Sequence, residues 1–299
     1  MSAPPSSSSL SVIDFLHQAA ARLRHAGVEE AELEARLLLE HTLGLSHSAL
    51  ILAPRRTLLP EELTHLDELL AQRLTRCPLS YLTGEREFWS LDFTVSPAVL
   101  IPRPETEFLL ECALAEQHRL PPQGLVLDLC CGSGVIAVVL ARELRQVRPI
   151  IGIDLSPAAL SVARGNAERH GVATRITWLC ADLGDALAPA AQYALVVTNP
   201  PYVASRELAG LEPEVREHEP RLALDGGEDG LTVIRRLLRQ IGPALVPGGL
   251  LFCEIGADQG TSVQALAQET KLFDQIMVQR DWADRPRVLR LRRCHKGIS

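Results

Sequence analysis

Features that mark secreted, membrane-bound or metal-binding proteins are scarce in this sequence of 299 residues. The seven cysteines are an odd number without a paired metal-ligand spacing, and the adjacent Cys130 and Cys131 are poorly placed to form a disulfide. The nine histidines are scattered, so we predict no metal site. No apolar run approaches the roughly 20 residues that a transmembrane helix needs. We therefore expect a cytoplasmic protein with reduced thiols.

Lysine is almost absent and occurs only at Lys271 and Lys296. The formal net charge of -7 at pH 7 argues against the broad positive surface of a nucleic-acid-binding protein. We therefore expect no direct nucleic-acid contact, and we expect a monomer. The chain length and the hydrophobic fraction of 46% suffice for one large domain and one smaller domain.

The chain is predicted to contain a tail, a helical domain, a linker and an α/β domain. Residues 1–9 are rich in serine and proline and are predicted to be disordered. Residues 10–76 carry leucines at helical spacing, and Pro60 suits the first turn of a helix. Residues 77–105 contain two short aromatic strands, which predict a β-hairpin within a linker. Residues 106–299 alternate strands with helices, which predicts a doubly wound α/β sheet.

A glycine-rich turn after the first predicted strand of the α/β domain, residues 125–129, indicates a nucleotide-like ligand. Glycines such as Gly132 and Gly134 permit a tight turn and a close approach of a ligand to the start of a helix. The second predicted strand ends at Asp154, where a carboxylate can hold ribose hydroxyls. This pattern fits a dinucleotide dehydrogenase about as well as an enzyme that uses S-adenosylmethionine.

The fourth predicted strand, residues 195–198, is followed by Asn199, Pro200, Pro201 and Tyr202. Consecutive prolines lack the N–H groups that a central strand needs, so the chain must leave the sheet at Asn199. The carbonyls of Asn199 and Pro200 then remain available as acceptors, and Tyr202 offers a flat aromatic wall. Such a set can hold a planar NH2 group by its two hydrogens. Because hydride transfer has no use for this tetrad, we predict a methyltransferase.

These motifs resemble those of class I S-adenosylmethionine-dependent methyltransferases that act on amino groups, whose fold is a Rossmann-like doubly wound sheet. Residues 100–107, Leu-Ile-Pro-Arg-Pro-Glu-Thr-Glu, and residues 219–224, Glu-Pro-Arg-Leu-Ala-Leu, narrow the resemblance to the peptide chain release factor glutamine methyltransferases (HemK/PrmC family). The sequence departs from the family pattern at Cys130 and Cys131, where a Gly-Thr pair is usual. It departs again at Leu183, where a tryptophan is frequent.

The resemblance implies transfer of a methyl group from S-adenosyl-L-methionine to the side-chain amide nitrogen of the glutamine in the Gly-Gly-Gln motif of release factors. The predicted catalytic residues are Asn199, Pro200 and Tyr202. The predicted substrate contacts are Asn199, Pro200, Pro201, Tyr202, Phe93 and Arg103. The predicted cofactor contacts are Asp128, Cys130, Cys131, Gly132, Ser133, Gly134, Asp154, Asp182, Leu183 and Asn199. The helical domain, which has no catalytic constellation, is predicted to select the release factor.

Three other functions stay open at this point. One is methylation of a ribosomal protein glutamine, and another is methylation of an adenine amino group in nucleic acid. The latter requires base flipping and a basic groove. The C-terminal arginines could supply positive charge, but they alternate with apolar residues and are predicted to lie on the exposed side of an edge strand. The third is a non-catalytic adaptor that retains the fold.

Overall fold

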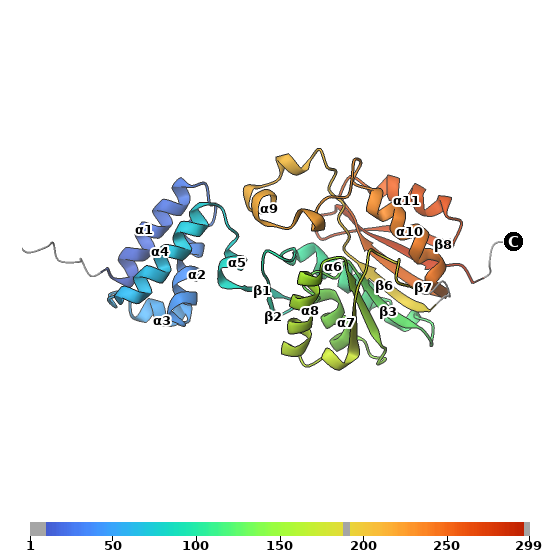
Figure 1. Ribbon diagram of the computed structural model, residues 1–299, viewed down its shortest axis with the longest axis horizontal. Coiled ribbons are helices and arrows are strands. Elements are labelled where there is room, and N and C mark those ends of the chain that lie inside the picture. The colour runs from blue at the N-terminus through green and yellow to red at the C-terminus, as the bar shows by residue number, and fades with distance from the viewer. Residues whose placement is uncertain (1–9, 188–191, 296–299) are drawn as a thin grey trace, which may run out of the picture. The chain divides into compact units, whose positions relative to one another are not determined.

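Figure 1 shows the computed structural model, which describes residues 10–187 and 192–295. The chain forms two compact units, of which the first comprises Met1–Gly84 with Pro213–His218 and the second Glu85–Glu212 with Glu219–Ser299. The predicted disordered tail, residues 1–9, lies outside the described residues. None of the helices in the described part is long and apolar enough to cross a membrane.

The first unit is a small helical bundle. Its helices are α1 (Val12–His25), α2 (Ala31–Leu43), α3 (His47–Leu52), α4 (Pro60–Leu74), α5 (Leu79–Thr83) and α9 (Pro213–His218). Pro60 begins α4 as predicted, and Gly44 ends α2 in the left-handed conformation at φ 61°. Leucines and alanines of α1, α2 and α4 fill the core. The short helices α3, α5 and α9 were not predicted, because five or six residues are too few to show helical periodicity.

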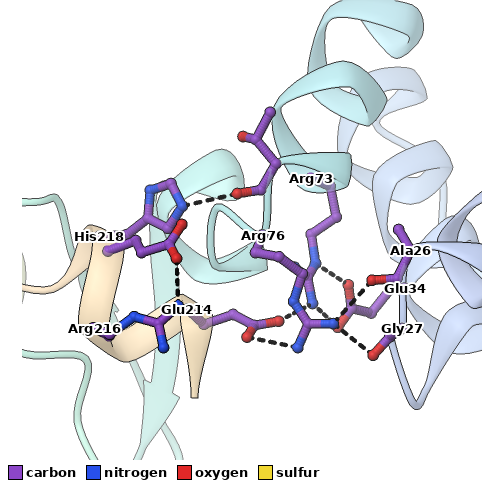
Figure 2. A network of polar contacts seen from close by, with 10 residues as sticks. Ala26, Gly27, Glu34, Arg73, Arg76, Glu214, Arg216 and His218 are labelled. Atoms are coloured by element: carbon purple, nitrogen blue, oxygen red, sulfur yellow. Dashed lines mark hydrogen bonds and ion pairs between the residues drawn. The ribbon is translucent and has the colours of Figure 1, made fainter. Parts of the chain in front are cut away.

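A buried ion network holds α9 to the helical bundle, although α9 is far from the bundle in sequence (Figure 2). The Arg73 side chain is only 4% exposed and pairs with Glu34 and, at 2.9 Å, with Glu214. Arg76 pairs with the same Glu214 at 2.7 Å. Burial alone would raise the pKa of Glu214, but its hydrogen bonds from Arg76 and Arg73 lower it overall. Glu214 is therefore held as a carboxylate between two guanidinium groups.

The second unit contains, within the described residues, a seven-stranded sheet in the order β5-β4-β3-β6-β7-β9-β8. The strands are β3 (Leu125–Leu129), β4 (Ile150–Asp154), β5 (Ile176–Cys180), β6 (Tyr193–Thr198), β7 (Leu245–Glu254), β8 (Phe273–Arg280) and β9 (Pro286–Arg293). Strands β3 to β7 run parallel, whereas β9 is antiparallel to both β7 and β8. The predicted doubly wound class is confirmed, with an antiparallel hairpin added at one side.

Helices cover both faces of this sheet (Figure 1). They are α6 (Pro104–Ala115), α7 (Val135–Glu143), α8 (Pro157–Arg169), α10 (Thr232–Ala244) and α11 (Gly260–Glu269). Alternate strand residues divide between two cores, because successive side chains of a strand point to opposite faces. Val126 and Leu195 belong to the core with α6 and α7, whereas Leu127 and Val196 belong to the core with α10 and α11.

The prediction of an exposed arginine edge is wrong for β9. This strand lies between β7 and β8, so it is not an edge. Arg290 is only 2% exposed and is paired with Glu116, and Arg287 is 8% exposed and is paired with Asp281 at 3.2 Å. These arginines therefore satisfy local acids rather than forming a free basic surface.

The aromatic hairpin belongs to the second unit and not to a linker. Strands β1 (Glu85–Phe88) and β2 (Leu91–Thr94) pair antiparallel. The buried Asn166 of α8 accepts a hydrogen bond from Thr94 N at 2.8 Å and donates to Thr94 O at 3.0 Å. Asn166 Nδ2 also lies 2.9 Å from Ser133 O, so it joins the hairpin to the glycine-rich turn. The predicted linker, residues 77–105, is thus divided between the two units.

Candidate active site

A cavity of about 260 Å³ opens within the second unit at the carboxyl ends of the parallel strands. The loops after β3, β4, β5 and β6 all contribute to its wall, as expected for a ligand site in an open α/β sheet. The predicted site residues that line it are Arg103, Cys130, Cys131, Gly132, Ser133, Asp154, Asp182, Leu183, Asn199 and Pro201. The structure therefore brings together most of the residues that the motifs predicted.

The glycine-rich turn after β3 is built from left-handed backbone. Cys130, Gly132 and Gly134 have φ angles of 57°, 51° and 79°. A Cβ atom at Gly132 would meet no atom within 4 Å, so this turn leaves open space for a ligand. A Cβ atom at Gly134 would instead lie 2.9 Å from Ala163 Cβ, so this glycine serves close packing. The same left-handed conformation costs about 1 kcal/mol of backbone strain at Cys130, because this residue has a Cβ atom.

Asp154 connects two walls of the cavity. Its Oδ2 accepts a hydrogen bond from Gly132 N at 2.8 Å, and its Oδ1 accepts one from Ser156 N at 2.9 Å. Burial raises the pKa of Asp154, and the two backbone hydrogen bonds oppose that shift. Each oxygen keeps a second lone pair, which suits the hydroxyl donors of a ribose.

Asp128 and Gly134 differ from the prediction, because neither is among the described residues that line the cavity. Asp128 is fully buried, and its Oδ2 accepts a hydrogen bond from Ala137 N at 2.9 Å, which fixes the start of α7. Its Oδ1 has no hydrogen-bond partner among the described residues. A buried acceptor without a partner costs about 1–3 kcal/mol.

Asn199 stands at the end of β6, where the buried strand stops at Thr198. Thr198 Oγ1 donates to Leu129 O at 2.8 Å and so ties the ends of β6 and β3 together. Asn199 Nδ2 donates to Thr106 Oγ1 at 3.0 Å. Among the described residues, no donor reaches Asn199 Oδ1 or the Pro200 carbonyl, so both acceptors remain available.

Curated relatives decide the family of this chain. A release factor glutamine methyltransferase of Moorella thermoacetica is 44% identical over 276 residues, which cover 91% of this chain and 95% of that protein. The release factor glutamine methyltransferase of Geobacter sulfurreducens is 42% identical over 257 residues, covering 86% and 88%. The chain belongs to the release factor glutamine methyltransferase family. The resemblance that the motifs indicated is confirmed.

Two family models match separate parts of the chain, and solved structures share its fold. The PrmC N-terminal domain matches residues 14–84, and the methyltransferase small domain matches residues 104–215. The hMettl16 catalytic domain aligns with a TM-score of 0.54 at 14% identity, covering 77% of this chain and 83% of that one. The T. thermophilus 16S rRNA methyltransferase RsmC, solved with AdoMet and guanosine, aligns with a TM-score of 0.50 at 19% identity, covering 70% and 49%. The fold is that of class I methyltransferases.

Two residues that were predicted to contact the substrate, Phe93 and Tyr202, are not among the described residues that line the cavity. Phe93 is fully buried in the core, where it packs against Phe88 and His170. It fills the underside of the hairpin and does not line the cavity. Tyr202 is also outside the described cavity lining, and its hydroxyl donates to the buried Glu254 at 3.0 Å. The hydroxyl of Tyr202 is thus bound within the second unit, and a contact of its ring with the substrate stays a prediction.

Pro200 is buried as well and is not part of the described lining, so its backbone carbonyl alone remains a candidate contact. Arg103 does line the cavity, and it pairs with the buried Glu219, which also accepts a hydrogen bond from Ile101 N at 3.2 Å. Glu219 begins the second family segment and so explains why that segment accompanies the Arg-Pro motif. Asp182 lines the cavity and pairs with Arg236 at 3.0 Å.

The cysteines that replace the usual Gly-Thr pair are neutral thiols. Burial raises the pKa of both Cys130 and Cys131, and the nearby Asp128 and Asp154 carboxylates raise it further. Neither side chain is therefore a thiolate near neutral pH. They line the cavity as apolar groups and do not compete with the substrate for an electrophilic methyl group.

Sequence reasoning missed Thr106, Glu254 and Arg236. Thr106 lies within the Ile-Pro-Arg-Pro-Glu-Thr-Glu segment, so a signal existed, but its role depends on a partner from β7. Glu254 ends β7, where a fully buried acid would have been visible as a charge closing an apolar strand. Arg236 gave no signal, because one arginine on an amphipathic helix looks like any exposed residue.

Proposed function

We propose that this chain transfers the methyl group of S-adenosyl-L-methionine to the side-chain amide nitrogen of the glutamine in the Gly-Gly-Gln motif of a peptide chain release factor. It is a protein-glutamine N-methyltransferase by family. The observation that carries the proposed mechanism is the Asn199 side chain, whose Oδ1 has no donor among the described residues and whose position is on the same cavity as the Asp154 loop.

S-Adenosyl-L-methionine is the cofactor, and it supplies an electrophilic methyl group. The residues that line the cavity fit its chemistry. Asp154 offers two oxygens to ribose hydroxyls, and the open turn at Gly132 leaves room beside them. Leu183 offers an apolar side chain to the adenine in place of the tryptophan that the family often has.

Orientation is the main contribution of the protein to this reaction. An amide nitrogen is a weak nucleophile because its lone pair is delocalised into the carbonyl. We infer that Asn199 Oδ1 and the Pro200 carbonyl accept its two hydrogens, which aims the nitrogen and stabilises the positive charge that develops on it. Transfer would form the carbon–nitrogen bond as the carbon–sulfur bond of the sulfonium breaks and a neutral thioether leaves, and the nitrogen would then lose one proton to solvent. The reaction therefore needs no strong base.

We propose that the helical unit, together with α9, selects the release factor. A lone glutamine side chain offers too few contacts to be distinguished from other exposed glutamines, so specificity must come from a further surface. We also propose that the protein acts in the cytoplasm, as a monomer, and without direct nucleic-acid contact. The net charge of -7 and the internal pairing of the C-terminal arginines support the last point.

The test is mass spectrometry of a release factor incubated with the protein and isotopically labelled cofactor. We expect one labelled methyl group on the glutamine of the Gly-Gly-Gln motif. A factor in which asparagine replaces that glutamine is the matched control and should stay unlabelled. Label on a ribosomal protein or on nucleic acid adenine, with none on the release factor, would contradict the proposal.

A further inference from the structure

A buried polar chain lies behind the Asn199 side chain in the second unit. Asn199 Nδ2 donates to Thr106 Oγ1 at 3.0 Å, and Thr106 Oγ1 donates to Glu254 Oε2 at 2.7 Å. The other oxygen, Glu254 Oε1, accepts the hydroxyl of Tyr202 at 3.0 Å. Thr106 is 3% exposed and Glu254 is fully buried, so water does not compete for these hydrogen bonds.

The direction of this chain follows from its hydrogens. Burial raises the pKa of Tyr202, so its phenol keeps its proton and donates to Glu254. The single hydrogen of the Thr106 hydroxyl is used on Glu254 as well. Thr106 therefore presents only a lone pair to Asn199. The amide nitrogen of Asn199 can donate a hydrogen to that lone pair, whereas the amide oxygen of Asn199 has no hydrogen to donate and would be repelled.

Glu254 receives one hydroxyl hydrogen on each of its two oxygens, and this arrangement requires the carboxylate form. Burial raises its pKa, but the hydrogen bonds from Thr106 and Tyr202 and the charge of Arg287 oppose the shift. A carboxylate accepts on both oxygens, which is what two hydroxyl donors on opposite sides require. Its distance along the sequence from Asn199 hides this role from any local motif.

The two ends of an asparagine amide have nearly the same shape, and only hydrogen bonds decide which end faces the cavity. The substrate amide brings hydrogens, so it needs an oxygen there. If Asn199 were turned over, its own NH2 group would meet the substrate NH2 group, and neither could accept. The orientation imposed by Thr106 is thus the productive one.

We propose that Thr106 and Glu254 are positioning residues that hold the Asn199 amide with its nitrogen on Thr106 and its oxygen toward the substrate. This inference rests on the proposed glutamine methylation. It also assigns a role to the threonine of the Ile-Pro-Arg-Pro-Glu-Thr-Glu segment. This threonine lies in the first turn of α6 and lines the cavity.

The test compares Thr106→Val, which keeps the shape but removes the hydroxyl, with Thr106→Ser, which keeps the hydroxyl. We expect Thr106→Val to lower kcat on intact release factor about tenfold, the worth of about one neutral hydrogen bond. The KM for the release factor and the Kd for S-adenosylhomocysteine should change by less than about twofold. Thr106→Ser should recover most of kcat.

A double-mutant cycle separates positioning from general damage. In an Asn199→Ala background, single-turnover methylation should be the same with Thr106 or Val at position 106, because there is no amide left to orient. If Thr106→Val lowers methylation tenfold in both backgrounds, or in neither, the inference is wrong. Should Thr106→Val fold poorly, Glu254→Gln answers the same question, since glutamine has one acceptor for two hydroxyl donors and should also act only through Asn199.

The wild-type reaction separates failure of the proposed function from failure of the positioning inference. If the wild-type enzyme leaves the release factor glutamine unmethylated, the proposed function fails and the positioning inference fails with it. If the wild type methylates that glutamine and Thr106→Val does so at an equal rate, only the positioning inference is overturned.

Discussion

Glu214 carries the most distinctive long-range contact of the helical unit, and its removal has a calculable effect. In Glu214→Ala, Arg76 loses a charged hydrogen bond of 2.7 Å and Arg73 loses one of 2.9 Å. A hydrogen bond to a charged group contributes about 1.5–3 kcal/mol. Arg73 keeps its pairing with Glu34, and the variant also avoids the cost of desolvating the Glu214 carboxylate, so we expect a net loss of about 2 kcal/mol.

Hydrogen exchange followed by mass spectrometry measures this loss directly. Because about 1.4 kcal/mol is a factor of ten, 2 kcal/mol predicts exchange roughly 30-fold faster in the peptide that contains α9. Glu212→Ala is the matched control, since Glu212 is an exposed acid two positions before Glu214. Equal exchange in the two variants would refute the idea that the ion network holds α9.

The pH dependence of the same contact has a definite sign. The folded pKa of Glu214 is lowered from its ordinary value of 4.5. Its stabilisation is therefore complete above that value and is lost as the pH falls through the lowered folded pKa. The difference in exchange between wild type and Glu214→Ala should be constant around neutral pH, after correction for intrinsic exchange rates. It should shrink in acid, and a difference that grew in acid would contradict the assignment.

Two further predictions concern the cofactor cavity. Asp154→Ala should weaken S-adenosylhomocysteine binding at least tenfold by calorimetry, because the loops after β3 and β4 lose the carboxylate between them, and unchanged affinity would contradict its role. Gly134→Ala should lower the free energy of unfolding by about 2 kcal/mol, because its Cβ would lie 2.9 Å from Ala163 Cβ at a φ of 79°. The loss should appear as a lower thermal midpoint. Gly165→Ala in α8, where a Cβ meets open space, should be neutral or stabilising, and equal midpoints for the two variants would refute this packing argument.

Local motifs predicted the parts of the site that short stretches of chain determine. The turn around Gly132, the carboxylate of Asp154 and the exit of the chain at Asn199 all depend on residues within one strand and its following loop. Parallel strands then place these loops at one edge without any further information. The same locality explains why β3 has its predicted bounds and why β4 ends at Asp154 as predicted.

What the sequence left open depends on partners that are distant along the chain. Tyr202 was expected to face the substrate, but Glu254, 52 positions away, takes its hydroxyl. Phe93 was predicted to contact the substrate, but Asn166 holds its hairpin against the core. Helix α9 joins the helical bundle through Arg73, 141 positions away. None of these pairings changes hydrophobic periodicity, so periodicity could not predict them.

The measurement that tests the central claim most directly is the methylation rate of intact release factor by Asn199→Ala. This variant removes one of two acceptors for the substrate amide and leaves the Asp154 loop untouched. We expect turnover to fall by roughly two to three orders of magnitude, as for the loss of one oriented electrostatic partner, with S-adenosylhomocysteine affinity within about twofold of the wild type. Near-normal turnover would mean that Asn199 is a turn residue and that the glutamine amide is held by other groups.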